Sequence, residues 1–212
     1  MEVVPLGSAD EIAALAADVF EAVVRRKPEA VLGLATGSTP LPAYQELIRR
    51  HEAGVGPSYA AVTCFNLDEY VGLPAGHEQS YRATIARELT DGLGFSPDRV
   101  NGPDPAPDGL PTAGQRYEAL IEAAGGVDVQ VLGIGSDGHL AFNEPGSSLA
   151  SRTRIKTLTA ETQKDNARFF GSPDRVPTHV LTQGLGTILA ARLDRLAYYR
   201  EVYAAKPAWQ GL

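Results

Sequence analysis

Apolar runs of strand length alternate with amphipathic segments of helix length in this sequence, and that order constrains the fold more than any other feature. The apolar runs lie at residues 30–35, 61–67 and 127–135. Helical spacing of apolar residues predicts helices at 8–26, 41–54, 81–93 and 112–126. Strands that alternate with helices favour a mostly parallel sheet with helices on both faces. The sequence therefore predicts an α/β fold of three layers, Rossmann-like in type.

The remaining segments predict shorter elements and long loops. We expect a short strand at 2–6, loops at 68–80 and 94–111, a strand or hairpin at 151–159, a helix at 161–171, a strand, turn and helix at 178–192, and a final helix at 193–205. The loop at 94–111 is rich in proline, but no change of composition marks a domain boundary there. We therefore expect residues 1–212 to form one domain.

Charge and cysteine content exclude several classes of protein. A formal net charge of -7 over 212 residues argues against nonspecific nucleic-acid binding. The one cysteine, Cys64, excludes an internal disulfide and a cysteine-rich metal site, and its apolar neighbours predict a core residue. Neither a signal-peptide pattern nor an apolar run of bilayer length occurs in the sequence, so we expect a cytoplasmic protein.

The first predicted strand ends in the loop "TGSTP". Ligands of α/β sheets bind outside the carboxyl ends of the strands, so this loop and those after the next strands are expected to converge. Backbone N–H groups and hydroxyls of Gly37, Ser38 and Thr39 suit a phosphate at a helix N-terminus. The alternative is that Ser38 or Thr39 only caps the helix and Pro40 starts it. The residues alone leave both interpretations open.

Ionisable side chains follow the other two strands. Asp68 and Glu69 come directly after one of them, where a carboxylate is a general base, a solvated loop acid or a helix cap. Asp137, His139 and Glu144 lie in the glycine-rich stretch "GIGSDGHLAFNEPG". An imidazole between two carboxylates suits a proton relay. A zinc site is the rival, but the spacing does not match H-E-x-x-H, and no G-x-S-x-G elbow supports serine hydrolysis.

Basic residues gather in two places further along the chain. Arg152, Arg154 and Lys156 alternate, so they would share one face of a strand, as an anion site, a subunit contact or a solvated positive face. Arg168 precedes two aromatic residues in "NARFFG". Its guanidinium suits either a phosphate clamp or a surface ion pair.

Several stretches together resemble the glucosamine-6-phosphate deaminase family of sugar-phosphate isomerase-deaminases. They include "LGLATGSTP", "FNLDEYVGL", "GIGSDGHLAFNEPGSSLASRTRIKTLT", "ARFF" and "LTQGLGT", in order from the N-terminus to about residue 190. The resemblance implies conversion of glucosamine 6-phosphate and water to fructose 6-phosphate and ammonia. It also implies that the chain needs no metal and no redox cofactor.

The resemblance also implies a role for each matching residue. Asp68 matches the base that moves a proton between C2 and C1 of the open sugar through an enolamine. His139 matches the residue that opens the pyranose ring, and Asp137 and Glu144 match its relay partners. Ser38, Thr39 and Arg168 fall on phosphate-binding positions.

Regulation differs among members of the family that the chain resembles. Some members are hexamers activated by N-acetylglucosamine 6-phosphate, and others are monomers without activation. Ser147, Arg154 and Lys156 match positions of the regulatory phosphate site in the activated members. The resemblance therefore implies a small-molecule sugar-phosphate ligand, and in its activated form a homo-oligomer with a second phosphate site.

The chain departs from the family pattern near residues 190–195. The family continues there with a further strand and a loop that carries a phosphate-binding lysine, whereas Lys206 is the only lysine after residue 164 and does not match. Losing one cation weakens phosphate binding, so we expect impaired activity. The rival functions are a hydrolase like 6-phosphogluconolactonase, against which "FNEP" and Glu144 argue, and a sugar-phosphate sensor without turnover.

Overall fold

A parallel sheet with the strand order β4-β2-β1-β5 lies at the centre of the computed structural model, which describes residues 4–74, 76–135 and 137–192. Its strands are β1 (Val31–Leu34), β2 (Thr63–Asn66), β4 (Val100–Asn101) and β5 (Val129–Gln130). Leu32 of β1 is in register with Cys64 on one side and with Val129 on the other. β1 and β2 thus confirm the predicted strands, whereas only two residues of the predicted strand 127–135 pair as β5.

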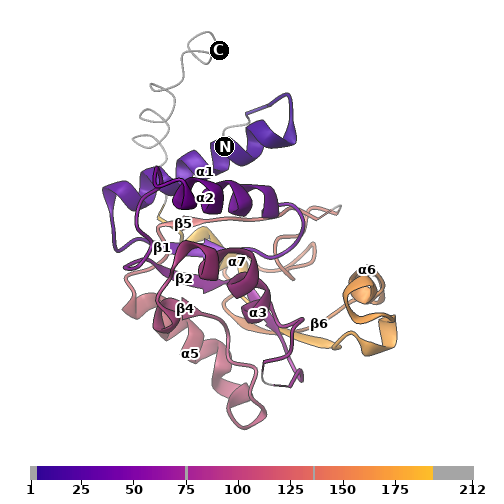
Figure 1. Cartoon of the computed structure of the whole chain (residues 1–212). Coiled ribbons are helices and arrows are strands. Elements are labelled where there is room, and N and C mark those ends of the chain that lie inside the picture. Colours follow the sequence, from indigo (N-terminus) through magenta and orange to yellow (C-terminus); the bar gives the residue numbers. More distant parts are fainter. Residues whose placement is uncertain (1–3, 75, 136, 193–212) are drawn as a thin grey trace.

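Helices cover both faces of this sheet, as predicted. They are α1 (Ala9–Arg26) and α2 (Leu41–Glu52) on one face and α5 (Leu110–Ala123) on the other, as Figure 1 shows. Successive side chains of a strand point to opposite faces. Leu32 accordingly packs in one core with Phe20 of α1 and Tyr44 of α2, while Val31 packs with Tyr117 of α5. The α/β fold with a mostly parallel central sheet is confirmed.

A second sheet is antiparallel, with the order β3-β7-β6. It contains β3 (Asp68–Tyr70), β6 (Arg154–Thr157) and β7 (His179–Thr182). The prediction of a loop over 68–80 is therefore wrong at its start. The chain passes between the sheets at Leu67, whose N–H donates to Leu34 O of the first sheet and whose carbonyl accepts from Gln183 N beside the second. Pairing with β7 makes Asp68–Tyr70 a strand, although its own sequence gives no strand signal.

The other elements are mostly helical. They are α3 (Tyr81–Ile85), the π-helix η1 (Ala86–Thr90), α4 (Asp91–Leu93), the 3₁₀ turns η2 (Pro97–Arg99), η3 (Pro107–Gly109) and η4 (Pro173–Arg175), α6 (Ala160–Phe170) and α7 (Leu185–Leu189). The predicted loop 94–111 contains the edge strand β4 and two of these turns. Residues 4–6 form no strand, and the predicted helix 193–205 lies outside the described residues.

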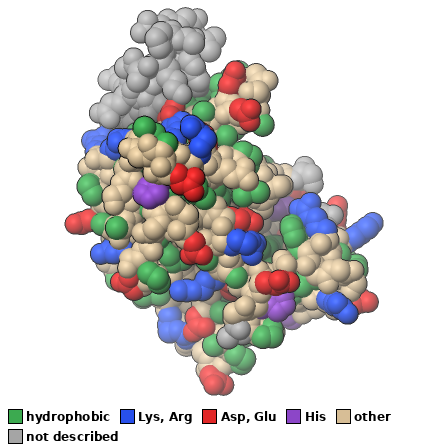
Figure 2. Space-filling model, viewed as in Figure 1, with side chains coloured by type: hydrophobic (Ala, Val, Ile, Leu, Met, Phe, Trp, Pro, Cys, Tyr) green, Lys and Arg blue, Asp and Glu red, His purple; other side chains and the backbone are tan. Residues whose placement is uncertain are grey.

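The surface shows no segregation of charge over the face seen in Figure 2, where acidic and basic side chains are interspersed. Among the described residues, no helix is long and apolar enough to cross a membrane.

Candidate active site

A cavity of roughly 600 Å³ opens where the chain leaves β1, β2 and β5. Residues 35–38 follow β1, residues 67–68 follow β2, and residues 133–134 with His139 lie beyond β5. The predicted convergence of these three loops is therefore confirmed. The rest of the wall comes from α2, β3, α3, η1 and α6, and from loop residues 79 and 141–142. A cavity of this size suits a small-molecule ligand.

The loop between β1 and α2 presents unused hydrogen-bonding groups to the cavity. Gly37 has a φ of 111°, which a glycine adopts without strain, and Gly37 and Ser38 line the cavity. The N-cap of α2 is Pro40, and no side chain caps this helix. The alternative in which Ser38 or Thr39 serves as the helix cap is therefore wrong. Both hydroxyl side chains are exposed, although Thr39 does not line the cavity.

Arg168 reaches the same cavity from the last turn of α6. Its guanidinium carbon lies 4.7 Å from the centroid of the Phe169 ring, which also lines the cavity. The cation therefore rests on an aromatic face and makes no ion pair with any described acid. The guanidinium N–H groups are therefore available to bind an anionic ligand, together with the hydrogen-bonding groups of Gly37 and Ser38 in the same cavity.

Two carboxylates in the described part of the chain line the cavity, Asp68 and the half-buried Glu88, and Asp68 is the buried one. Only 7% of the residue is exposed, and no described residue donates a hydrogen bond to its side chain. Burial, and after it the negative charge of Glu69, raises the pKa of Asp68 to about 8. A desolvated carboxylate without donors holds a proton tightly, which is the property that a general base requires.

His139 faces the cavity from the glycine-rich loop, and Asp137 holds its ring. The imidazole Nδ1 lies 2.5 Å from Asp137 Oδ1, and the His139 backbone N–H donates to the same oxygen over 3.1 Å. These two hydrogen bonds lower the pKa of Asp137. An ionised Asp137 needs the hydrogen on Nδ1, so the Nε2 lone pair is left to accept a proton.

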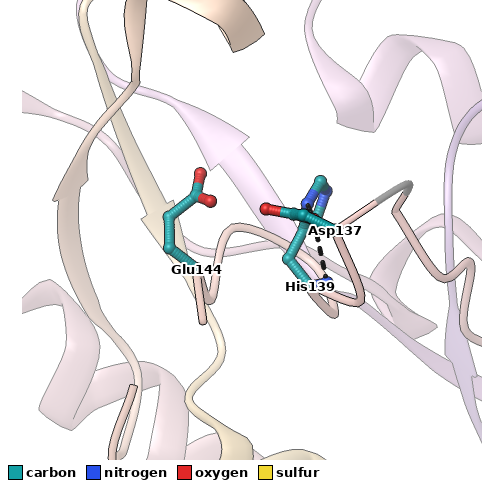
Figure 3. Close-up of side chains that lie close together, drawn as sticks. All are labelled: Asp137, His139 and Glu144. Carbon is teal, nitrogen blue, oxygen red and sulfur yellow. Dashed lines mark hydrogen bonds and ion pairs between the residues drawn. The ribbon is translucent and has the colours of Figure 1, made fainter. Parts of the chain in front are cut away.

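Glu144 completes this group from the other end of the loop (Figure 3). Ligand atoms of Asp137, His139 and Glu144 all lie within 4.8 Å of one another. Of the three, only His139 lines the cavity. The arrangement suits a proton relay from the ligand to two carboxylates. The same donor set also fits a divalent cation, so the sequence-based prediction of a site without metal stays a prediction.

Glycines give the imidazole its space. A Cβ on Gly135 would overlap the His139 ring, and the Gly135 N–H donates to His139 O over 2.9 Å. Gly138 has a φ of 89°, so the chain turns back between Asp137 and His139. The position of the His139 ring therefore requires glycine at 135 and 138.

Sequence reasoning missed the aromatic part of the wall. Tyr70, Tyr81 and Asn166 line the cavity, and both Tyr81 Oη and Asn166 Nδ2 donate to Tyr70 Oη, over 3.0 and 3.1 Å. The available signal was the strand period, which puts Tyr70 on the same face as Asp68 once both are assigned to β3.

The basic cluster lies outside this cavity. Arg154 and Lys156 are half-buried on one face of β6, as the alternation predicted. Arg152 instead pairs with Glu118 of α5 at 2.6 Å. Among the described residues, no hydrogen bond or ion pair joins Ser147 to Arg154 or Lys156.

Known proteins resemble this chain over nearly its whole length. A model of the family described as glucosamine-6-phosphate isomerases/6-phosphogluconolactonase matches residues 7–188. The glucosamine-6-phosphate deaminase of Arthrobacter sp. (strain FB24) is 50% identical over 261 aligned positions that cover all of both chains. That of Pseudarthrobacter chlorophenolicus is 59% identical over 192 positions, 91% of this chain and 73% of the relative. The 261-position alignment exceeds the 212 residues of this chain, so part of the relative has no counterpart here.

Solved structures share the fold. The structure of a monomeric glucosamine-6-phosphate deaminase superposes with a TM-score of 0.86 at 40% identity, and covers 90% of this chain and 79% of that chain. A 6-phosphogluconolactonase from Trypanosoma brucei superposes with a TM-score of 0.67 at 21% identity, over 89% of this chain and 78% of that chain. At that identity the second likeness concerns the fold alone.

Proposed function

Because this chain belongs to the family of glucosamine-6-phosphate isomerases and 6-phosphogluconolactonases, we propose that it is a glucosamine-6-phosphate deaminase. It converts glucosamine 6-phosphate and water to fructose 6-phosphate and ammonia. Relatives that are 48–59% identical to this chain bear this name, whereas the 6-phosphogluconolactonase from Trypanosoma brucei is 21% identical. The deaminase is therefore the better-supported activity.

The main structural support for this proposal is the set of groups that face the cavity. A buried carboxylate without donors, an imidazole oriented by a second carboxylate, and an anion cradle all face one cavity. The cradle consists of Gly37, Ser38 and Arg168, with Thr39 beside it. A phosphate held there fixes one end of a sugar chain, and the base and imidazole then act on the other end.

Each group has its own part in the proton transfers. His139 Nε2 accepts the proton of the anomeric hydroxyl and delivers it to the ring oxygen, which opens the pyranose. Asp137 and Glu144 stabilise the charge that develops on the imidazole. Asp68 then takes the proton from C2, while the aldehyde oxygen takes a proton from the ammonium group on C2, which gives the enolamine. Asp68 returns its proton to C1, which leaves an imine at C2. Water hydrolyses that imine to the ketose and ammonia.

A regulatory site is a finer part of the proposal. Ser147, Arg154 and Lys156 bind the phosphate of N-acetylglucosamine 6-phosphate, in a homo-oligomer. The half-buried position of Arg154 and Lys156 on one face of β6 supports this assignment. A rise in turnover on addition of that compound, lost in Lys156→Met, tests it. The relative that is described as monomeric makes the oligomeric state the first quantity to measure.

We also propose that the chain forms one domain, that this domain is shortened near residues 190–195, and that the protein acts in the cytoplasm. The alignment with the relative from Arthrobacter has 261 positions, whereas this chain has 212 residues, which supports a shortened domain.

The decisive experiment is an assay of the purified chain with glucosamine 6-phosphate. We expect ammonia and fructose 6-phosphate to appear in equal amounts. Thermal stabilisation by the compound without release of either product would contradict the proposal and indicate a sensor.

A further inference from the structure

Glu69 is a buried carboxylate that the proposed chemistry does not use. It lies in β3 between Asp68 and Tyr70, which both line the cavity. Because side chains alternate along a strand, Glu69 points away from the cavity and toward the start of α3. Only 4% of the residue is exposed, so its charge must be satisfied inside the protein.

Three backbone N–H groups satisfy that charge. Glu69 Oε1 accepts from Tyr70 N over 2.9 Å and from Tyr81 N over 3.0 Å, and Oε2 accepts from Arg82 N over 2.9 Å. Tyr81 and Arg82 are the first two residues of α3, whose N–H groups have no partner within the helix. The carboxylate thereby fixes the first turn of the helix against the strand that carries Asp68.

This attachment sets the cavity wall. The Tyr81 ring stacks on Tyr70 with centroids 4.7 Å apart, and its hydroxyl donates to Tyr70 Oη. Both rings line the cavity beside Asp68. Releasing the start of α3 would therefore move the aromatic surface next to the base.

Glu69 also places a second negative charge beside Asp68. The other titratable groups around the pair, among the described residues, come from the same strand, from neighbouring helices and from the opposite cavity wall. They are Tyr70 of β3, Tyr81 and Arg82 of α3, Arg87 and Glu88 of η1, Tyr117 of α5, Arg168 of α6 and His139. Burial raises the pKa of both carboxylates, but only that of Glu69 is lowered in turn by the three N–H donors and by Arg82. Because Asp68 has no such donors, we expect the first proton of the pair on Asp68, and the three N–H hydrogen bonds favour the ionised form of Glu69.

We infer that Glu69 is a positioning residue for the base: its carboxylate anchors α3 to β3 and keeps a fixed negative charge beside Asp68. This inference rests on the proposed function only in the choice of the reaction that the assay follows. Removing the charge makes Asp68 a weaker base that loses its proton at lower pH. A shorter acidic side chain keeps the charge but disturbs the anchor. The basicity of Asp68 should then stay unchanged.

Two substitutions separate charge from anchoring. Glu69→Gln removes the charge and keeps Oε1 as an acceptor for Tyr70 and Tyr81, although its amide NH2 cannot accept from Arg82 N. We expect the acid limb of kcat/KM to move to lower pH by about half a unit or more, with a reduced maximum. Glu69→Asp keeps the charge, so its acid limb should stay in place while kcat and the melting temperature fall. Glu118→Gln is the matched control, because Glu118 is a largely buried carboxylate outside the cavity that accepts a backbone N–H from Thr153.

Carboxyl-carbon NMR titration of Asp68 gives a second readout that needs no turnover. The Asp68 signal is identified by its loss in Asp68→Asn, and its midpoint should fall in Glu69→Gln alone. An unchanged midpoint and acid limb in Glu69→Gln, or equal shifts in Glu69→Asp, would overturn the inference and leave a simple helix cap. A shifted midpoint in a chain that releases no ammonia would sink the proposed function but not the role of Glu69.

Discussion

Replacing Asp68 by asparagine should remove activity and at the same time stabilise the fold at alkaline pH. The side chain keeps its size and loses its charge. Burial and Glu69 raise the pKa of Asp68 to about 8 in the folded protein, whereas an unfolded chain has a value near 4. The folded state therefore binds a proton that the unfolded state has already lost between these two pH values. Wild-type stability consequently falls as the pH rises through that window.

The size of the effect follows from the two pKa values. Each pH unit between about 4 and 8 costs the wild type roughly 1.4 kcal/mol, and the cost is constant above pH 8. The full window corresponds to at most about 5 kcal/mol, because relaxation and water in the cavity reduce the cost of an ionised carboxylate. The asparagine variant does not pass through this titration. Its advantage in free energy of unfolding should therefore be small near pH 5 and grow until about pH 8.

Urea unfolding of both proteins between pH 5 and pH 9 measures this difference directly. Turnover of glucosamine 6-phosphate, measured on the same samples, should fall by about a hundredfold or more because the base is lost. Asp108→Asn is the control, since it removes one exposed carboxylate in η3, outside the cavity. Parallel stability curves for wild type and Asp68→Asn, or turnover at the wild-type rate, would refute the assignment of a desolvated base.

Further outcomes follow from other parts of the cavity. The kcat/KM of the wild type should rise with pH, reach half its maximum near pH 8, where half of Asp68 is ionised, and level off above that pH; a level profile from pH 6 to 9 would contradict this. Arg168→Met should raise KM by about tenfold to a hundredfold, because a charge-assisted hydrogen bond contributes roughly 1.5–3 kcal/mol. Weaker inhibition by inorganic phosphate in the same variant checks that the lost contact is to phosphate. Gly135→Ala should displace the His139 ring and lower kcat at least tenfold with little change in melting temperature. Gly102→Ala, whose added methyl lies outside the cavity and meets only Asn66 Nδ2 at 3.7 Å, should leave kcat near the wild-type value.

Local signals in the sequence predicted the helices and the first two central strands well. Ser8 does cap α1, and its Oγ accepts from Glu11 N over 3.2 Å; the Glu11 carboxylate returns to Gly7 N and not to Ser8. These contacts join residues a few positions apart, so the local sequence encodes them. β3 depends on pairing with β7, more than a hundred positions away, and its own residues predicted a loop.

The site was predictable where it depends on strand ends and not where it depends on packing. Asp68, His139 and Ser38 share one cavity because parallel strands end at the same edge, whereas Arg168 reaches it from α6. The contact between Tyr70 and Asn166 joins β3 to α6, and no spacing in the sequence indicates it. Such contacts arise only when separately formed elements meet.

The position of Asp68 between two sheets has a consequence for how the protein matures. Gln183 Nε2 donates to Asn66 O across 117 positions of sequence, and the N–H of Gln183 donates to Leu67 O beside the base. Contacts of such separation form late, because a large loop must close before they stabilise the chain. A chain still under synthesis cannot assemble its base until residue 183 has left the ribosome. The base is therefore complete only in a chain whose two sheets have joined, and activity reports that junction.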